Sequence, residues 1–359
     1  MQRFASGKLC LDEESLSGES TTASSPCTTP SCEMPIEFVP IVGKAGWALL
    51  KEILSSCPED PDTHLSSPAY YMHTCRKGLW LCKLAGSEGP FAFAGRHPNV
   101  EDAWLVFPQP CHVDVNFISR VCALLPKCSG GVRVARIKEG SLPLFEGKSQ
   151  FQWVEELVLD WRFDCMVLST QMILEASGSA FSSFRKEKHY IAMEHVESKI
   201  VQSEADAAQV KKLFDDWADS VSDQKLFSKD NLIEPNMSGL LMALDPEENV
   251  TGVLISYHNE PIGFCAFEVL PGCKTSAGVS MAVNRAIRGA SAFCYWEICR
   301  HCLQMGFEEF NINGAETESL NAFRRKLKGG LSRSYKIHSF DWVAEGLDHP
   351  VSIKAFSKN

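Results

Sequence analysis

The sequence contains no apolar run of about 20 residues, the length that a membrane-spanning helix requires. Its first residues also lack the basic-then-apolar pattern of a secretory signal peptide. We therefore expect a cytoplasmic protein without a transmembrane segment. The motif Gly-x-Ser-x-Gly is missing as well, and without such a nucleophile elbow the scattered Ser, His and Asp residues do not indicate a serine hydrolase.

Cysteine is abundant, but its pattern lacks the regularity of a disulfide scaffold. The fifteen cysteines are odd in number and irregularly spaced, which disfavours a framework of paired cysteines. Cys299-Arg-His-Cys302 resembles half a zinc site, yet no second CxxC or HxxxH follows at metal-ligand distance. Cys294, Cys302 and Met305 fall on one apolar row of a predicted helix. We interpret these cysteines as buried structural thiols and predict no metal site.

The charge balance is acidic, with a formal net charge of −10. This balance argues against a general coating of nucleic acid, although a local basic groove is compatible with it. Residues 1–33 are rich in Ser, Thr, Glu and Pro and show almost no apolar periodicity, so we predict a disordered tail. The remaining length and the 45% hydrophobic content suffice for two domains with full cores.

The order of predicted elements is similar in the two halves of the chain. Leu79–Ala85 and Phe91–Gly95 predict one hairpin, and Val250–Tyr257 and Pro261–Val269 predict another. Ile287–Met305 is the longest predicted helix. In each half a helix, a hairpin, a strand, a long helix and a further strand follow one another. We therefore predict an α+β fold with mixed sheets and a boundary near residues 190–205.

A strand, a turn and a basic helix are predicted over residues 307–329. Asn313-Gly314 is a turn dipeptide because both residues tolerate positive φ, and Thr317 is a suitable N-cap for the helix that follows. Gly329-Gly330 ends that helix. Six basic residues and no acidic one lie between Asn321 and Lys336. We expect a solvated cationic rim that suits an anionic substrate.

Two segments resemble the C-terminal domain of the phosphatidylglycerol lysyltransferases, a tandem GNAT-fold family related to the FemA/FemB aminoacyltransferases. One consists of Phe163-Asp-Cys-Met-Val-Leu, Leu174, Gly178 and Phe184-Arg-Lys-Glu-Lys-His. The other consists of Phe310-Asn-Ile-Asn-Gly, Leu320, Phe323, Arg324 and Lys326. The likeness covers roughly residues 36–356. Cys165 stands where an aromatic residue is usual, and Arg324-Arg325 replaces the commoner single lysine.

The resemblance implies two tandem GNAT-like domains with mixed central sheets, over residues 34–197 and 198–359. It also implies an acyltransferase that moves an aminoacyl group from aminoacyl-tRNA, or an acyl group from acyl-CoA, to an amine or hydroxyl acceptor. The acceptor would be a small molecule or a lipid headgroup, and no resident cofactor is needed because the donor is already activated. Two alternatives stay open: an acetyl-CoA-dependent N-acetyltransferase, and an inactive GNAT-like domain that binds an anionic partner.

One candidate phosphate site is the turn that begins at Arg285. GNAT proteins that bind CoA carry a turn of the form Arg/Gln-x-x-Gly-x-Gly/Ala at a helix N-terminus, where backbone N–H groups hold the pyrophosphate. Arg285 to Ala290 fits this form except that Arg288 occupies the first glycine position, while Gly289 allows close approach. The partial fit weakens acetyl-CoA as donor and favours aminoacyl-tRNA. The alternative is a helix start with surface arginines.

Two basic clusters are further candidates for binding phosphate. They are the helix with Arg324 and Lys326, and the cluster with Arg185 and Lys186. Such contacts weaken steeply as salt rises, whereas basic helices are more often only solvated faces.

Four polar residues are candidates for the chemistry itself. Asn311 and Asn313 are two apart at a strand end, so we expect them to point to the same side and to offer amide donors near a reacting carbonyl. Asp164 and Glu268 are candidate general bases, since each is embedded in an apolar strand where its pKa would rise. Ordinary structural roles at strand ends and edges are the alternative for all four.

Overall fold

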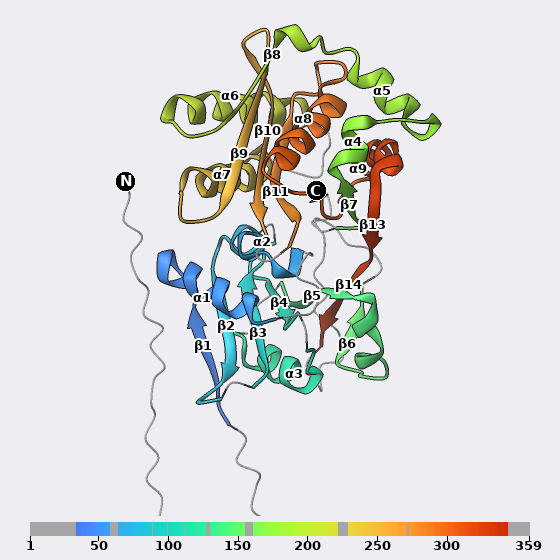
Figure 1. Cartoon of the computed structure of the whole chain (residues 1–359). Coiled ribbons are helices and arrows are strands. Elements are labelled where there is room, and N and C mark those ends of the chain that lie inside the picture. Colours follow the sequence, from blue (N-terminus) through green and yellow to red (C-terminus); the bar gives the residue numbers. More distant parts are fainter. Residues whose placement is uncertain are drawn as a thin grey trace, which may run out of the picture. The chain divides into compact units, whose positions relative to one another are not determined.

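The computed structural model describes residues 34–57, 64–87, 89–98, 100–110, 112–126, 130–154, 161–221, 229–270 and 273–343. The predicted tail at residues 1–33 lies outside this part of the chain. The chain from Pro35 onward forms one compact unit built around two seven-stranded sheets (Figure 1).

The first sheet has the strand order β1-β2-β3-β4-β5-β14-β6. Strands β4 and β5 run parallel, while the other neighbours are antiparallel, so the sheet is mixed. Alternating side chains of β2 to β5 pack α3 against one face and α1 and α2 against the other. The elements are β1 (Ile36–Pro40), α1 (Gly43–Ser55), α2 (Pro68–Thr74), β2 (Leu79–Leu84), β3 (Phe91–Arg96), β4 (Trp104–Pro108), α3 (Val115–Leu124), β5 (Val132–Lys138), β6 (Phe151–Trp153) and β14 (Ile337–Trp342).

The second sheet has the strand order β13-β7-β12-β11-β10-β9-β8. Helices α6 and α7 pack on one face, and α4, α5 and α8 pack on the other. Strands β11 and β12 run parallel between antiparallel neighbours. The elements are β7 (Cys165–Ser169), α4 (Thr170–Glu175), α5 (Ser182–Lys188), β8 (Val196–Ile200), α6 (Glu204–Val221), α7 (Lys229–Leu244), β9 (Val250–Tyr257), β10 (Glu260–Val269), β11 (Thr275–Val283), α8 (Ala290–Gln304), β12 (Glu309–Asn311), α9 (Glu318–Arg324) and β13 (Leu331–Tyr335).

The predicted α+β class with two mixed sheets is confirmed, and so is the hairpin at residues 250–269. That hairpin turns at His258 and Asn259, which both have positive φ, as a two-residue hairpin turn requires. The helix predicted over residues 287–305 corresponds to α8, but the prediction that it is the longest is wrong: α8 has 15 residues, whereas α6 and α7 have 18 and 16. Cys294, Cys299 and Cys302 of α8 are buried in the core, as expected for structural thiols.

The two sheets exchange strands across the predicted boundary. Strand β7 precedes residue 197 but lies between β13 and β12 in the second sheet, and β14 near the end of the chain lies between β5 and β6 in the first. Only Lys336 separates β13 from β14, so the chain passes from one sheet to the other at that residue. The domain limits at residues 197 and 198 stay a prediction.

Among the residues that the structure describes, no helix combines the length and the apolar character needed to cross a membrane.

Candidate active-site cleft

The second sheet opens between β11 and β12. The two strands pair at only three positions, from Thr275 opposite Glu309 to Ala277 opposite Asn311. Strand β12 ends there, whereas β11 continues to Val283. A β-bulge at the same place, between Gly278 and Ser280, bends β11 because Val279 has no counterpart on β10. The edge of β11 beyond Ala277 therefore has no β12 partner and faces a gap.

Asn313 spans this gap just after the end of β12. Its backbone has a φ of 59°, in the left-handed region that asparagine tolerates better than most residues. Its Nδ2 donates to the carbonyl of Gly278, at 2.6 Å, and so ties the end of β12 to the bulge. Its Oδ1 is buried and accepts no hydrogen bond from the described residues. Asn313 thus holds the opening in shape and presents an unused acceptor there.

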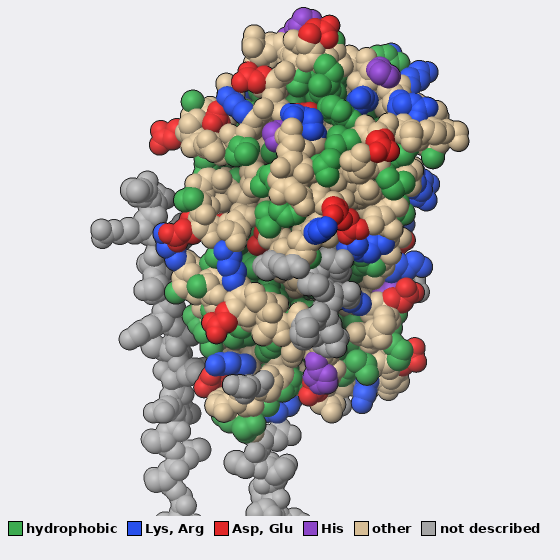
Figure 2. Space-filling model, viewed as in Figure 1, with side chains coloured by type: hydrophobic (Ala, Val, Ile, Leu, Met, Phe, Trp, Pro, Cys, Tyr) green, Lys and Arg blue, Asp and Glu red, His purple; other side chains and the backbone are tan. Residues whose placement is uncertain are grey.

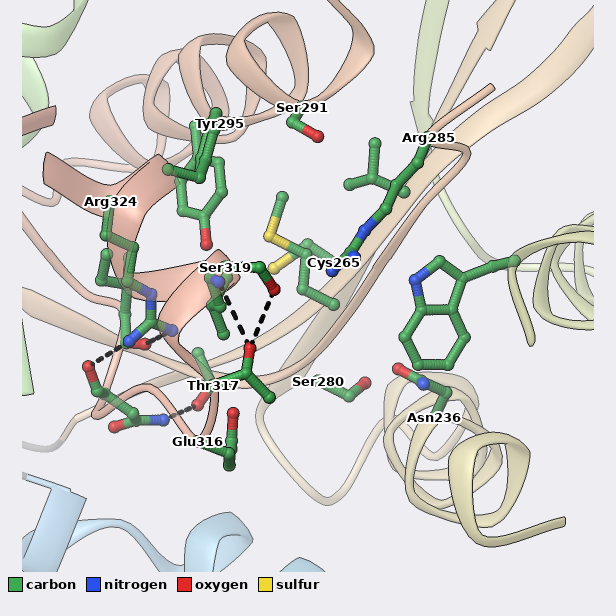
Figure 3. Close-up of a pocket in the computed structure, with 18 of the residues that line it drawn as sticks. Asn236, Cys265, Ser280, Arg285, Ser291, Tyr295, Glu316, Thr317, Ser319 and Arg324 are labelled. Atoms are coloured by element: carbon green, nitrogen blue, oxygen red, sulfur yellow. Dashed lines mark hydrogen bonds between the residues drawn. The ribbon is translucent and has the colours of Figure 1, made fainter. Parts of the chain in front are cut away.

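A cavity of about 880 Å³ lies over this opening, and residues from both halves of the chain line it. Figure 3 shows Arg285, Ser291 and Tyr295 on one side of the cavity and Glu316 and Thr317 on another. Tyr70, Arg136 and Trp161 add a wall from the first half. A volume of this size is typical of a small-molecule or cofactor site.

The N-terminus of α8 opens toward the cavity through Gly289 and Ser291. Gly289 has a φ of +85°, and a Cβ at this position would lie 2.3 Å from the carbonyl oxygen of Glu187, so the turn requires glycine. No described side chain caps the helix, and its first turn carries no acidic residue. Such a helix start favours an anion. Arg285 lines the cavity beside it, and burial lowers the pKa of its guanidinium.

Arg288, Lys186 and Lys326, which are predicted to bind phosphate, also line the cavity. Arg288 stacks on the ring of Tyr190, 3.7 Å from its centroid, and Lys326 pairs with Glu187 at 2.5 Å. Basic side chains gather over α5 on the face drawn in Figure 2; the basic residues of that helix are Arg185, Lys186 and Lys188.

Arg185 and Arg324 have structural contacts instead of the open positions that the sequence predicts. Arg185 donates to the carbonyls of Ala176 and Gly178, at 2.6 and 2.7 Å. Arg324 is buried and donates to the carbonyls of Ile312 and Asn313, at 2.7 and 2.8 Å (Figure 3). The expected solvated rim is therefore wrong at Arg324: its guanidinium donates to carbonyls just beyond the end of β12, of which that of Asn313 also accepts the backbone N–H of Met166, at 3.2 Å. Arg324 also lines the cavity.

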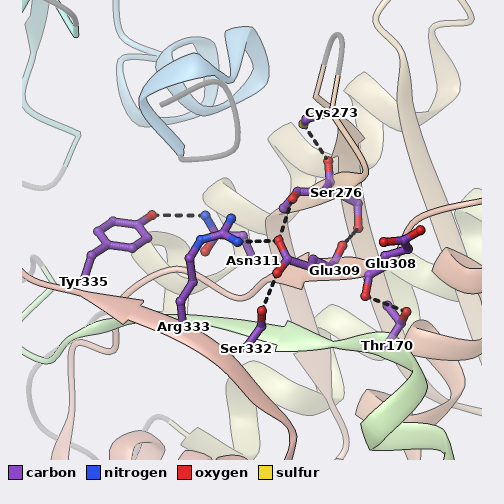
Figure 4. Close-up of polar contacts among 10 residues, drawn as sticks. Thr170, Cys273, Ser276, Glu308, Glu309, Asn311, Ser332, Arg333 and Tyr335 are labelled. Atoms are coloured by element: carbon purple, nitrogen blue, oxygen red, sulfur yellow. Dashed lines mark hydrogen bonds and ion pairs between the residues drawn. The ribbon is translucent and has the colours of Figure 1, made fainter. Parts of the chain in front are cut away.

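Asn311 and Asn313 differ in burial and in hydrogen-bond partners. Asn311 is fully buried, donates to the hydroxyl of Tyr335 at 3.1 Å, and accepts from the backbone N–H of Asn313 at 2.9 Å (Figure 4). The hydroxyl of Tyr335 also bonds His64 Nδ1 of the first half, at 2.8 Å. Strand β12 ends at Asn311, and the left-handed backbone at Asn313 departs from strand geometry. Only Asn313 belongs to the cavity lining.

Glu268 and Asp164 are not among the described residues that line the cavity. Glu268 is buried on β10, and burial raises its pKa to about 8, in the predicted direction. Its Oε2 accepts from Ser67 Oγ and from the backbone N–H of Ala69, at 2.5 and 3.0 Å, so it links β10 to the start of α2. Asp164 is exposed and precedes β7, so the expectation of an apolar setting is wrong for it.

Several polar residues of the cavity have no obvious sequence signal. Ser280 Oγ and His73 Nδ1 are buried and without a hydrogen-bond partner in the described structure. Burial lowers the pKa of His73 to about 3, which keeps the imidazole neutral, and burial raises the pKa of Tyr295. The Gly278-Val-Ser280 step in a strand is the one local hint, because glycine inside a strand often marks a bulge.

No family model matches the chain, and no curated protein matches its sequence. Solved structures do match its fold. A conserved protein of unknown function from Bacteroides thetaiotaomicron aligns with 86% of this chain and 100% of its own, with a TM-score of 0.62 and 11% identity. The C-terminal domain of a putative lysylphosphatidylglycerol synthetase from Agrobacterium fabrum aligns with 83% of this chain and 93% of its own, with a TM-score of 0.52 and 12% identity. The chain shares the fold of this synthetase domain.

FemX has the same fold as well, with a TM-score of 0.54, 9% identity, and coverage of 83% of this chain and 96% of its own. The predicted resemblance to the lysyltransferase domain and to Fem proteins is therefore confirmed at the level of the fold. At these identities the likeness establishes the fold, and function has to be argued from the site itself.

Proposed function

We propose that the protein is an acyltransferase that moves an acyl or aminoacyl group from an activated, phosphate-bearing donor to an amine or hydroxyl acceptor. The single observation that carries this proposal is the opening between β11 and β12, with the bulge on one side and Asn313 on the other. In this proposal, backbone N–H groups along the edge of β11 beyond Ala277 donate to a ligand carbonyl. Fixed N–H donors at such a place stabilise the oxyanion of acyl transfer.

The donor end of the cavity is the start of α8 together with Arg285, Arg288 and Lys186. A helix N-terminus and three cations suit the phosphates of acyl-CoA and equally those of an aminoacyl-tRNA end. The glycine turn directly before α8 has the form at which a helix start binds a compact pyrophosphate, and it supports acetyl-CoA-dependent N-acetylation as a second candidate function.

The chemistry requires no covalent enzyme intermediate. The acceptor nitrogen or oxygen attacks the donor carbonyl carbon, the bond from that carbon to the donor sulfur or ester oxygen breaks, and the acceptor loses one proton. Glu316, a carboxylate that lines the cavity close to Asn313 in sequence, is our candidate to receive that proton. Asn313 positions the reacting carbonyl through its hold on Gly278. Asn311, Asp164 and Glu268 have no part in this scheme.

A thermal-shift panel tests the donor. The full chain is heated with acetyl-CoA, longer acyl-CoAs and charged tRNA, and stabilisation by any of them supports the proposal. Stabilisation by CoA esters alone would exclude tRNA as donor. No shift with any donor would instead favour an inactive domain that binds another anionic partner.

Asn313→Ala tests the opening itself. We expect at least a tenfold loss of kcat with whichever donor binds, since the end of β12 is no longer tied to the bulge. Asn259→Ala is the matched control: Asn259 also has positive φ, at 64°, but lies in the β9–β10 turn and is not among the described residues of the cavity lining. Equal kcat in the two variants would contradict the role of Asn313.

A further inference from the structure

The segment that follows α5 packs directly against the start of α8. A Cβ placed on Gly289 would lie 3.0 Å from the Cβ of Tyr190, as well as 2.3 Å from the carbonyl oxygen of Glu187. The backbone N–H of Tyr190 donates to that same carbonyl, at 3.1 Å. Because glycine has no side chain, Tyr190 sits in close contact with the helix start to which the proposed function assigns the donor phosphates.

Tyr190 and Arg288 form a stacked pair at this place. The guanidinium carbon of Arg288 lies 3.7 Å from the ring centroid of Tyr190. Both side chains are exposed, the tyrosine to 38%, and both line the cavity. The pair therefore presents a planar ring and a planar guanidinium to the cavity. Proteins bind nucleobases by stacking them on aromatic rings and on arginine guanidinium planes.

The positions of both residues are fixed by their neighbours in the chain. Ile191, which follows Tyr190, is buried in the core of the second sheet, and Ile287, which precedes Arg288, packs against the same core. Less conformational entropy is then lost when a base joins the stack. The carboxylate of Glu187 also lines the cavity, but it pairs with Lys326 at 2.5 Å, which offsets its repulsion of a phosphate.

We infer that the Tyr190–Arg288 stack binds the adenine base of the donor. Acyl-CoA and aminoacyl-tRNA both carry an adenosine next to a phosphate, so one base site serves either donor. The contact between Gly289 and Tyr190 puts the helix start and the stack within the span of one nucleotide. The assignment to the donor rests on the proposed function, whereas the base site is defined by its own geometry.

Two probes that differ only in the base test this site. AMP and ribose 5-phosphate share the sugar and the phosphate, and both are titrated into the full chain by isothermal titration calorimetry. We expect AMP to bind about fivefold to a hundredfold more tightly, the range that base–aromatic stacking supplies. Added salt should weaken both probes and leave their ratio nearly unchanged, since salt screens the phosphate contacts and not the stacking.

Variants locate the base preference. Tyr190→Leu should abolish it, and Tyr190→Phe should keep it, since the ring remains. Tyr257→Leu is the matched control, because Tyr257 packs on His258, 4.3 Å between ring centroids, and is not among the described lining residues.

Arg288→Gln separates stacking from phosphate binding. Loss of the stacked cation should lower the ratio of the two affinities about twofold to fivefold, whereas loss of a phosphate contact alone would weaken both probes equally. Lys188→Gln is the control for charge: Lys188 also joins α5 to α8, over the ring of Trp296 at 4.2 Å, but is not among the described residues of the cavity lining. We expect its affinity ratio to equal that of the wild type.

CoA and the trinucleotide CCA, the end of a tRNA, identify the source of the adenosine. Whichever of them loses affinity in Tyr190→Leu, but not in Tyr257→Leu, carries the base that the stack binds. The inference is overturned if neither does, if AMP binds no better than ribose 5-phosphate, or if its advantage survives in Tyr190→Leu.

Thermal shift with acyl-CoA and charged tRNA on the same variants keeps this inference apart from the proposed function. Stabilisation by a donor without any base preference would refute the base site and leave the proposed function standing. A base preference without stabilisation by any donor would leave the base site standing and refute the proposed function.

Discussion

Replacing Glu268 by glutamine is expected to remove a pH dependence of stability that this one carboxyl group creates. Glu268 accepts two hydrogen bonds at the start of α2, from Ser67 and Ala69, while it lies buried on β10. A glutamine side-chain oxygen accepts the same two bonds without carrying a charge. The variant thus keeps the link between the two halves of the chain and loses only the titration.

The magnitude follows from the pKa, which burial raises from 4.5 to about 8. Below pH 4.5 the carboxyl is protonated in both states and carries no penalty. Between 4.5 and about 8 the unfolded chain ionises while the folded protein stays protonated, so stability falls as pH rises through this window. At pH 7 the carboxyl has cost about 3 kcal/mol of folding free energy relative to pH 4.5.

Urea unfolding at pH 5, 6, 7 and 8 measures this effect. The free energy of unfolding of the wild type, minus that of Glu268→Gln, should decrease steadily from pH 5 to pH 8. At neutral pH the variant should be the more stable of the two. Glu268→Ala serves as a contrast, because it leaves the buried hydroxyl of Ser67 and the N–H of Ala69 without their acceptor and is expected to destabilise at every pH. Parallel pH profiles for wild type and Glu268→Gln would refute the reasoning.

Two further predictions concern the cavity. Gly289→Ala should weaken donor binding at least tenfold and lower the urea midpoint, since its Cβ would lie 2.3 Å from the Glu187 carbonyl oxygen. Gly306→Ala is the control: Gly306 has a similar φ but open space around it, so this variant measures the cost of the backbone conformation alone. Arg324→Met should cost about 2 kcal/mol of unfolding free energy, because the buried carbonyl of Ile312 loses its donor, whereas that of Asn313 keeps the backbone N–H of Met166 at 3.2 Å. Arg325→Met should cost less than about 1 kcal/mol, since its ion pair is exposed; equal losses for the two arginines would contradict the assignment.

Local features of the fold could be predicted from the sequence because their causes are local. The hairpin at residues 250–269 follows from two apolar runs around a turn, and Thr317 does cap α9, accepting the N–H of Leu320 at 3.2 Å. The buried cysteines of α8 follow from their apolar spacing. In each case the chemistry that decides the structure lies within a few residues of its effect.

The site could be predicted only where it depends on such local chemistry. The Arg285–Gly289 turn lies directly before α8 and lines the cavity, as its local sequence suggests. The burial of Arg324 depends instead on carbonyls about twelve residues away. The sequence of a basic helix is the same whether its arginines are solvated or buried. The alternation of Val132-Arg-Val-Ala-Arg predicts a strand and conceals the bulge at Arg136. Arg133 of the same strand is buried against Asp341 at 3.0 Å, a partner that no local pattern reveals.

The exchange of β7 and β14 between the sheets has a consequence for the order in which the protein folds. During synthesis β7 emerges early but must wait for β12 and β13, and the first sheet lacks an interior strand until β14 follows them. Pairings of such high sequence separation make folding slow and leave strand edges open in the meantime. The cleft between β11 and β12 is therefore completed late, when the last strands join both sheets into one cooperative unit.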